Sequence, residues 1–148
     1  TIKNYHWLDL VMGQFEAYDR GAQTAAVVDA KGNIKEGPGF NIFMIKDSQL
    51  RTAAEGVLQG ITRKTTIELA QQLGLSIEFG EVSAEAFRNA DEAFATSTAG
   101  GIMAITQIDE KIIGTGQIGP LTLQLKDAYW AMHKQPKYAI EVVYEQGP

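Results

Sequence analysis

The sequence predicts a single domain of the mixed α/β class. Apolar residues recur at helical spacing in several segments, of which 8–18 is the clearest. Short apolar runs with the composition of strands lie between these segments but do not alternate strictly with them, so the class is mixed. With 148 residues, of which 45% are hydrophobic and 21% charged, residues 1–148 have the size and composition of one globular domain.

The first half of the chain is expected to form one helix and four strands. Gly21 ends the helix, and glycine, proline and asparagine separate the strands. The segments are a helix over 8–18 with apolar residues at 8, 11, 12, 15 and 18, a short buried strand over 24–29, a second strand through Ile34 and Glu36, a third over 40–45 that is buried on both faces, and a fourth over 50–52.

The second half is expected to contain three helices among further strands. Ser83 is a good N-cap for a short helix, and Pro120 suits the first turn of a longer one. The segments are a helix that Thr62 caps and Gly74 closes, a strand over 75–79, a helix over 83–89, a strand over 92–96, a hairpin of 102–108 with 111–113, a helix from Pro120 to His133, and an extended segment over 138–144.

Composition argues against several classes of protein. The net charge of −5 and the absence of a dense Lys/Arg block argue against a nucleic-acid partner. No apolar run approaches the roughly 18 residues of a membrane span, and no signal peptide opens the chain. Without cysteine there is neither a disulfide nor a thiolate site, which is compatible with a cytoplasmic enzyme, and the distant His6 and His133 predict no metal site. The lack of an initiator methionine suggests a piece of a longer protein.

The segment from Gly56 to Thr62, which runs into a helix, is the first candidate site. Two glycines four residues apart free the backbone, and the following helix directs unpaired N–H groups and its positive dipole end at one point. A phosphate or carboxylate suits such a point. By local features alone, an ordinary strand-to-helix connection with a threonine cap is the more common case.

Two charged residues and a second loop are further candidates. Lys3, beside an aromatic pair that prefers burial, would become a usable nucleophile if desolvated, although most lysines are solvated surface charges. Glu36, before Gly-Pro-Gly, could face a protonated ring nitrogen, or it could be a solvated edge residue. The small residues of 96–101 could form a nest of amides around an anion, or a flexible loop. Together, an amine, a lone carboxylate and two anion-binding loops suit pyridoxal phosphate.

These residues resemble the class IV pyridoxal-phosphate aminotransferases, which include branched-chain, D-amino-acid and (R)-selective amine transaminases. Lys-Asn-Tyr-His-Trp, from Lys3 to Trp7, is similar to the catalytic-lysine segment of the family, and Glu-Gly-Pro-Gly-Phe-Asn, from Glu36, is similar to its Glu-Gly-x-Gly-x-Asn motif. The runs 56–63 and 96–103 resemble its two phosphate-side loops. The resemblance implies the C-terminal large domain of the D-amino-acid or branched-chain aminotransferase-like fold.

The resemblance also implies a role for each site residue. Lys3 would form the Schiff base with the aldehyde of pyridoxal phosphate and then move a proton, and Glu36 would keep the pyridine nitrogen protonated. Leu58 would pack on the ring. The phosphate would be held by Ile61, Thr62 and Thr98, and the substrate would be contacted by Trp7, Thr98 and Ala99.

The implied reaction is transfer of an amino group between a small-molecule amine and a keto acid such as pyruvate. Trp7, Phe40 and Gly100-Gly101 favour the (R)-selective amine transaminases, and Leu8 stands where branched-chain enzymes tend to place a tyrosine. A branched-chain or D-amino-acid aminotransferase, a class IV lyase, and a non-catalytic fragment or assembly module are the alternatives. Family members carry a further N-terminal half, which is missing from this chain, and form homodimers. The resemblance therefore implies two partners, the N-terminal half of the same protein and a second copy of the complete chain.

Overall fold

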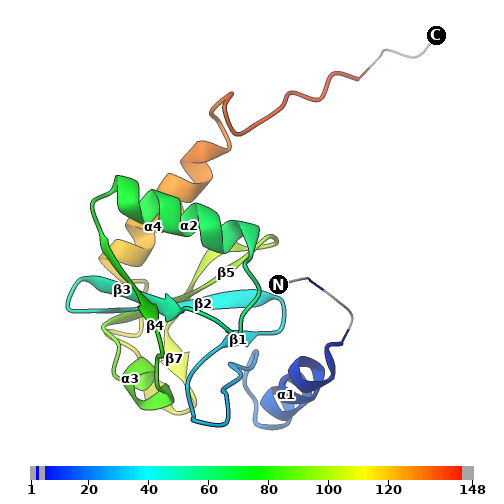
Figure 1. Ribbon diagram of the computed structural model, residues 1–148, viewed down its shortest axis with the longest axis vertical. Helices are drawn as coiled ribbons and strands as arrows, with labels where there is room; N and C mark the ends of the chain where they lie inside the picture. Colours follow the sequence, from blue (N-terminus) through cyan, green and yellow to red (C-terminus); the bar gives the residue numbers. More distant parts are fainter. Residues whose placement is uncertain (1–2, 4–5, 145–148) are drawn as a thin grey trace.

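The computed structural model describes Lys3 and residues 6–144, and a six-stranded sheet forms its centre (Figure 1). In chain order the strands are β1 (Glu36–Gly37), β2 (Phe40–Lys46), β3 (Gln49–Ala53), β4 (Ser76–Gly80), β5 (Glu92–Ser97) and β6 (Gly101–Ile105). In space the order is β4-β3-β2-β5-β6, with β1 paired to the start of β2. Only β3 and β4 run parallel, and α2 (Ile61–Gln72) connects them. The predicted mixed α/β class is confirmed.

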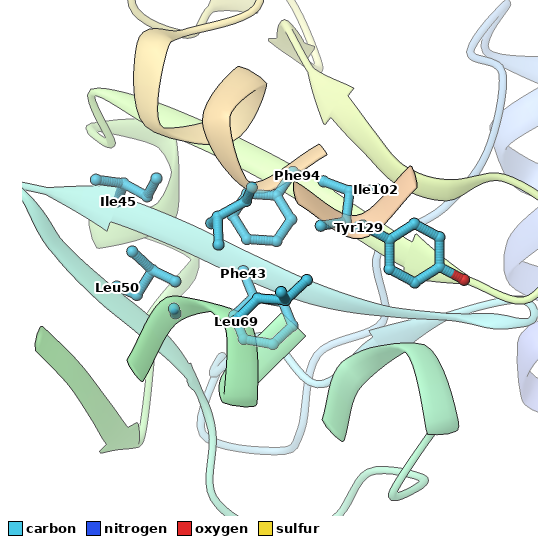
Figure 2. Packing of buried hydrophobic residues seen from close by; sticks show 9 residues of the cluster. Phe43, Ile45, Leu50, Leu69, Phe94, Ile102 and Tyr129 are labelled. Carbon is cyan, nitrogen blue, oxygen red and sulfur yellow. The ribbon is translucent and has the colours of Figure 1, made fainter. Parts of the chain in front are cut away.

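Helices α2 and α4 (Pro120–Met132) cover one face of the sheet. Phe43 of β2 and Phe94 of β5 stack there with ring centroids 5.0 Å apart, and Figure 2 shows them together with Leu69 of α2 and Tyr129 of α4. Alternate side chains of a strand point to opposite faces, and the intervening Ile42 and Met44 belong to a second buried cluster. The central strand is therefore buried on both faces, as its unbroken apolar run predicts.

The second cluster is formed with smaller elements. Helix α3 (Ala84–Arg88) begins at Ser83, whose hydroxyl accepts a hydrogen bond from the Ala86 amide at 3.1 Å, so the predicted cap is confirmed. Phe87 of this helix packs against the cluster. The predicted hairpin is divided into β6 and a separate pair, β7 (Gln107–Ile108) and β8 (Lys111–Ile112), because the chain leaves the sheet after Ile105.

Two predicted strands do not form. Residues 24–29 make only an isolated bridge between Val28 and Ile34, and Val28 is exposed rather than buried. The segment 138–144 is exposed and pairs with no strand among the described residues. Residues 27–29 do exchange backbone hydrogen bonds with 33–36, for example from the Val27 amide to the Glu36 carbonyl at 2.8 Å, but this contact is too short to make a strand.

Helix α1 (Leu8–Asp19) lies beside the sheet rather than on it (Figure 1). The predicted helix is confirmed, but Ala17 is its one buried residue, Leu10 is half-buried, and the other large apolar side chains are exposed. Within the described part of the chain, no helix is both long and apolar enough to cross a bilayer.

Candidate functional site

Pairing of three neighbouring strands places one row of polar residues across the sheet. Glu36 of β1 lies opposite Asn41 of β2, and Asn41 lies opposite Thr96 of β5. The Gly-Pro-Gly turn reverses the chain between Glu36 and Asn41, so residues five positions apart become direct neighbours. Asn41 and Thr96 are buried and Glu36 is half-buried.

The Glu36 carboxylate is held in place by the loop that follows β3. Its Oε2 accepts hydrogen bonds from the Leu58 amide at 2.9 Å and from Asn41 Nδ2 at 3.3 Å. Asn41 Nδ2 also donates to the Leu58 carbonyl at 2.8 Å. An amide nitrogen with two protons can serve both acceptors. Oε1 of Glu36 has no hydrogen bond within the described residues, so it is available to a ligand.

Asn41 is a site residue whose role does not follow from the Glu-Gly-Pro-Gly-Phe-Asn motif alone. Its partners are 5 and 17 positions away in the sequence, and only the folded chain brings them together. The signal that could have found it is the motif itself, since an asparagine in an apolar strand needs polar partners when buried.

The start of α2 is an open amide site next to Asn41. Gly60 is the N-cap residue, and since glycine has no side chain, no side-chain cap is present. The predicted cap by Thr62 is wrong: Thr62 is the second helical residue, because the helix already begins at Ile61. The amides of Ile61 and Thr62 are among the first N–H groups of a helix, which find no partner within it.

Glycine is required at position 60 by close packing. A β-carbon on Gly60 would lie 2.5 Å from Asn41 Oδ1, which is too close for any side chain. The Gly60 amide donates to the Leu58 carbonyl at 2.9 Å, which tightens the turn into α2. The start of α2 and the Glu36 carboxylate are therefore joined through Leu58 and Asn41.

Helix α4 shows what a filled helix start looks like in the same chain. The Glu92 carboxylate accepts from the amides of Leu121 at 3.1 Å and Thr122 at 2.7 Å. Here the chain supplies its own anion to the positive end of the helix dipole. No described residue does the same for α2, so its start has the chemistry of a site for an external phosphate or carboxylate.

The other predicted phosphate and substrate ligands differ in burial. The Thr62 side chain is nearly buried, and Thr66 Oγ1 donates to the Thr62 carbonyl at 2.8 Å. Thr98 and Ala99 lie exposed in the turn from β5 to β6. The hydroxyl of Thr96, at the start of the predicted anion-binding run 96–101, is buried without a hydrogen-bond partner among the described residues.

Arg63 is a second residue that sequence reasoning missed. Its side chain is 3% exposed and donates to the Ala53 carbonyl at 2.8 Å and to Gln59 Oε1 at 2.7 Å, so it ties both ends of the loop to α2. Burial lowers the pKa of its guanidinium from the ordinary value. A depression of about 370 Å³ opens beside Arg63 and Phe79, and none of the predicted site residues lines it.

Lys3 is not brought to the site by any described contact. It is exposed, and its Nζ lies 5.7 Å from the centroid of the half-buried Trp7 ring. In the described part of the chain Lys3 is therefore a solvated amine, which is the common case for a lysine, and its catalytic role stays a prediction. Its neighbours Asn4 and Tyr5 in the predicted lysine segment lie outside the described residues.

The fold and this site define a mixed α/β domain with a fixed carboxylate and an open helix start on one edge of its sheet. Residues 1–108 match the family described as amino-transferase class IV, and the chain belongs to that family.

Relatives and solved structures agree with this assignment. The chain is 36% identical over 128 residues to a branched-chain-amino-acid aminotransferase of Pseudomonas aeruginosa, and the match covers 86% of this chain and 42% of that protein. It is 33% identical over 131 residues to a putative branched-chain-amino-acid aminotransferase of Methanocaldococcus jannaschii, and this match covers 87% of this chain and 46% of that protein.

Among solved structures, the pyridoxal-phosphate form of a branched-chain aminotransferase from Thermobaculum terrenum superposes with a TM-score of 0.84 at 33% identity, over 89% of this chain and 45% of that one. A branched-chain aminotransferase from Thermoproteus uzoniensis with norvaline has a TM-score of 0.82 at 35% identity, over 89% and 45%. The chain thus spans less than half the length of these relatives, and its fold is that of branched-chain aminotransferases.

Proposed function

We propose that residues 1–148 form the cofactor-binding C-terminal domain of a pyridoxal-phosphate-dependent aminotransferase. The observation that carries the proposal is the Glu36 carboxylate, hydrogen-bonded to Leu58 and Asn41 and connected by them to the open start of α2. The free Oε1 fits a protonated ring nitrogen, and the uncapped amides of Ile61 and Thr62 fit a phosphate. The residues present therefore fit the cofactor.

Each site residue then has a definite task. Pyridoxal phosphate supplies an electron sink for amino-group transfer when bound. Glu36 holds the proton at the ring nitrogen, while Ile61 and Thr62 bind the phosphate with Thr98. Leu58 contacts the ring face. The Lys3 amine binds the cofactor and moves a proton at the substrate carbon, which requires that the rest of the protein enclose it.

We propose branched-chain amino acids with a keto acid as the substrate class, because the relatives named above are branched-chain aminotransferases. An (R)-amine with a pyruvate-like acceptor is the second candidate. Trp7, Gly100-Gly101 and Leu8 favour it, with Trp7, Thr98 and Ala99 contacting the substrate. A homodimer of complete chains in the cytoplasm, each with its N-terminal half, is the expected assembly.

Borohydride reduction tests the cofactor site. The full-length protein is incubated with pyridoxal phosphate, reduced and digested, and mass spectrometry is expected to find the pyridoxyl group on Lys3. A Glu36→Gln variant is expected to keep the adduct yet lose at least about 100-fold in turnover, since a neutral amide cannot hold the ring proton. No adduct on Lys3 would favour a non-catalytic fragment or assembly module.

Steady-state rates distinguish the substrate classes. L-leucine, D-alanine, and (R)- and (S)-1-phenylethylamine are offered to the same protein with 2-oxoglutarate or pyruvate. Turnover of leucine alone supports the branched-chain class, and turnover of the (R)-amine alone supports the second candidate. Elimination of ammonia without a keto acid would instead indicate a lyase.

A further inference from the structure

Helix α1 turns most of its large apolar residues away from the rest of the chain. The side that faces the protein carries small and polar residues together with the half-buried Leu10: a β-carbon on Gly13 would lie 3.5 Å from Ala25 Cβ, and Ala17 is buried. Gln14 anchors this face, because its Oε1 accepts from Thr24 Oγ1 at 2.7 Å and its Nε2 donates to the Gln23 carbonyl at 3.0 Å. These contacts fix which side of α1 points outward.

The outward side of α1 is a continuous stripe of large apolar residues. We call this the α1 stripe, and its members with their exposed fractions are Leu8 71%, Val11 38%, Met12 57%, Phe15 56% and Tyr18 60%. The spacing of 3 and 4 residues puts all five on one face of the helix. Scattered exposed apolar residues are normal in proteins, but a contiguous group of this size marks an interface.

We infer that the α1 stripe is the surface on which the missing N-terminal half of the protein packs. The chain matches less than half the length of its relatives, and the match lies in their C-terminal part. The stripe begins five positions after Lys3, so a segment joined ahead of Thr1 reaches it without a long connection. This inference goes beyond the proposed function, since it holds whether or not the chain is catalytic.

A second copy of the same chain is a weaker occupant. Stable dimers bury about 20–30 residues on each side, whereas the α1 stripe has five. A segment of the same polypeptide packs on such a small face because the covalent link keeps it at high effective concentration. Two copies, each with a net charge of −5, also repel each other at low salt.

Co-expression tests the inference. The N-terminal half encoded ahead of Thr1 is tagged and co-expressed with residues 1–148, and the amount of chain retained on the tag is measured. A Met12→Ser/Phe15→Ser variant is expected to reduce retention at least tenfold. The matched control, Ile112→Ser/Leu123→Ser, changes two residues of similar exposure on β8 and α4 and is expected to alter retention less than twofold.

Hydrogen exchange provides a second measurement that needs no variant. Amides of 8–18 are expected to exchange at least tenfold more slowly in the full-length protein than in the isolated chain. Equal retention of the two double variants, or equal exchange in the two proteins, would overturn the inference, as would a reading frame without an upstream half. A dimer of the isolated chain that Met12→Ser/Phe15→Ser dissolves would assign the stripe to a second copy instead.

Discussion

At the scale of single residues, Asn41 connects two features that are far apart in the sequence. One side-chain amide donates to both the Glu36 carboxylate and the Leu58 carbonyl. Because Leu58 also donates its amide to Glu36, the three groups form a closed set of hydrogen bonds. The carboxylate is thereby oriented before any ligand arrives, which is what a preorganised site requires.

A Gly60→Ala substitution should disturb this set of hydrogen bonds. The added β-carbon would meet Asn41 Oδ1 at 2.5 Å, so the asparagine must shift. We expect a loss of about 1–3 kcal/mol in the free energy of unfolding, measured by urea denaturation. Gly80→Ala is the control, because its β-carbon would meet nothing closer than Glu78 Oε1 at 4.0 Å. An equal loss in both variants would mean that the close contact at Gly60 is absent in solution.

Asp29 makes the stability of the chain depend on acid pH. The hydrogen bond from the Asn33 amide, aided by Lys35 and the Lys31 amide, lowers the pKa of Asp29 from 3.8 to about 2. A lowered pKa in the folded state means that the stabilisation is complete above pH 4 and is lost between pH 4 and 2.

An Asp29→Asn variant should therefore show a smaller change in urea midpoint between pH 5 and pH 2.5 than the parent chain. Asn cannot lose this contribution on acidification, because it has no charge to neutralise. Asp19→Asn, at an exposed residue at the end of α1, is the control and should follow the parent. If Asp29→Asn also follows the parent, the carboxylate of Asp29 does not contribute to the acid transition.

At the scale of elements, α2 and α4 differ in what their first turns bind. Glu92 reaches from β5 to the start of α4 and bonds two of its amides, so that helix is complete without a ligand. Helix α2 starts with Gly60 and has no such partner in the described chain. Two helices on the same face of the sheet thus have different roles, one holding the fold together and one presenting amides.

A Glu92→Gln substitution should weaken the start of α4. The neutral amide keeps the shape but loses the charge that favours the helix N-terminus, and one of the two helix amides loses its acceptor. We expect the free energy of unfolding to fall by about 1–3 kcal/mol. Thermal and urea denaturation measure this loss. Glu110→Gln, exposed in the turn between β7 and β8, should have no effect beyond about 0.5 kcal/mol. If Glu92→Gln leaves the free energy of unfolding unchanged, packing alone holds α4 in place.

At the scale of the whole molecule, the folded body ends with α4. Residues 140–144 are exposed and make no hydrogen bond with the rest of the described chain. The depression beside Arg63 is bordered by α2, and neither Glu36 nor the β5–β6 turn lines it. Both observations describe a domain whose core is complete but whose functional edge is open.

Ending the chain after Ala139 should leave its stability unchanged. Of the residues removed, 140–144 are exposed and have no hydrogen bond in the described chain, so we expect a loss of less than about 0.5 kcal/mol in the free energy of unfolding, measured by calorimetry or urea denaturation. Ending it after Gln124 should unfold the domain, because Leu125 and Tyr129 of the core would be lost. Marked destabilisation by the shorter deletion would mean that 140–144 pack on the body in solution.

The sequence by itself determined the local elements and the family. An unbroken apolar run identifies β2 because a strand buried on both faces needs apolar residues at successive positions. Glycine turns, the Ser83 cap and Pro120 identify boundaries because they favour the backbone conformations found there. The roles of Glu36, Leu58 and the start of α2 were expected from short motifs and the family resemblance, and they stay predictions; the structure shows that Glu36 and Leu58 are hydrogen-bonded to each other.

Only the tertiary structure decided which groups meet and which faces are covered. Asn41 and Arg63 find their hydrogen-bond partners, and Thr96 its burial, through segments that are distant in the sequence, and no local pattern reports such contacts. The apolar period of α1 defines a face but not what lies against it, and here that face points away from the sheet. A periodic pattern records that a surface avoids water, whereas its partner is set by the three-dimensional path of the chain.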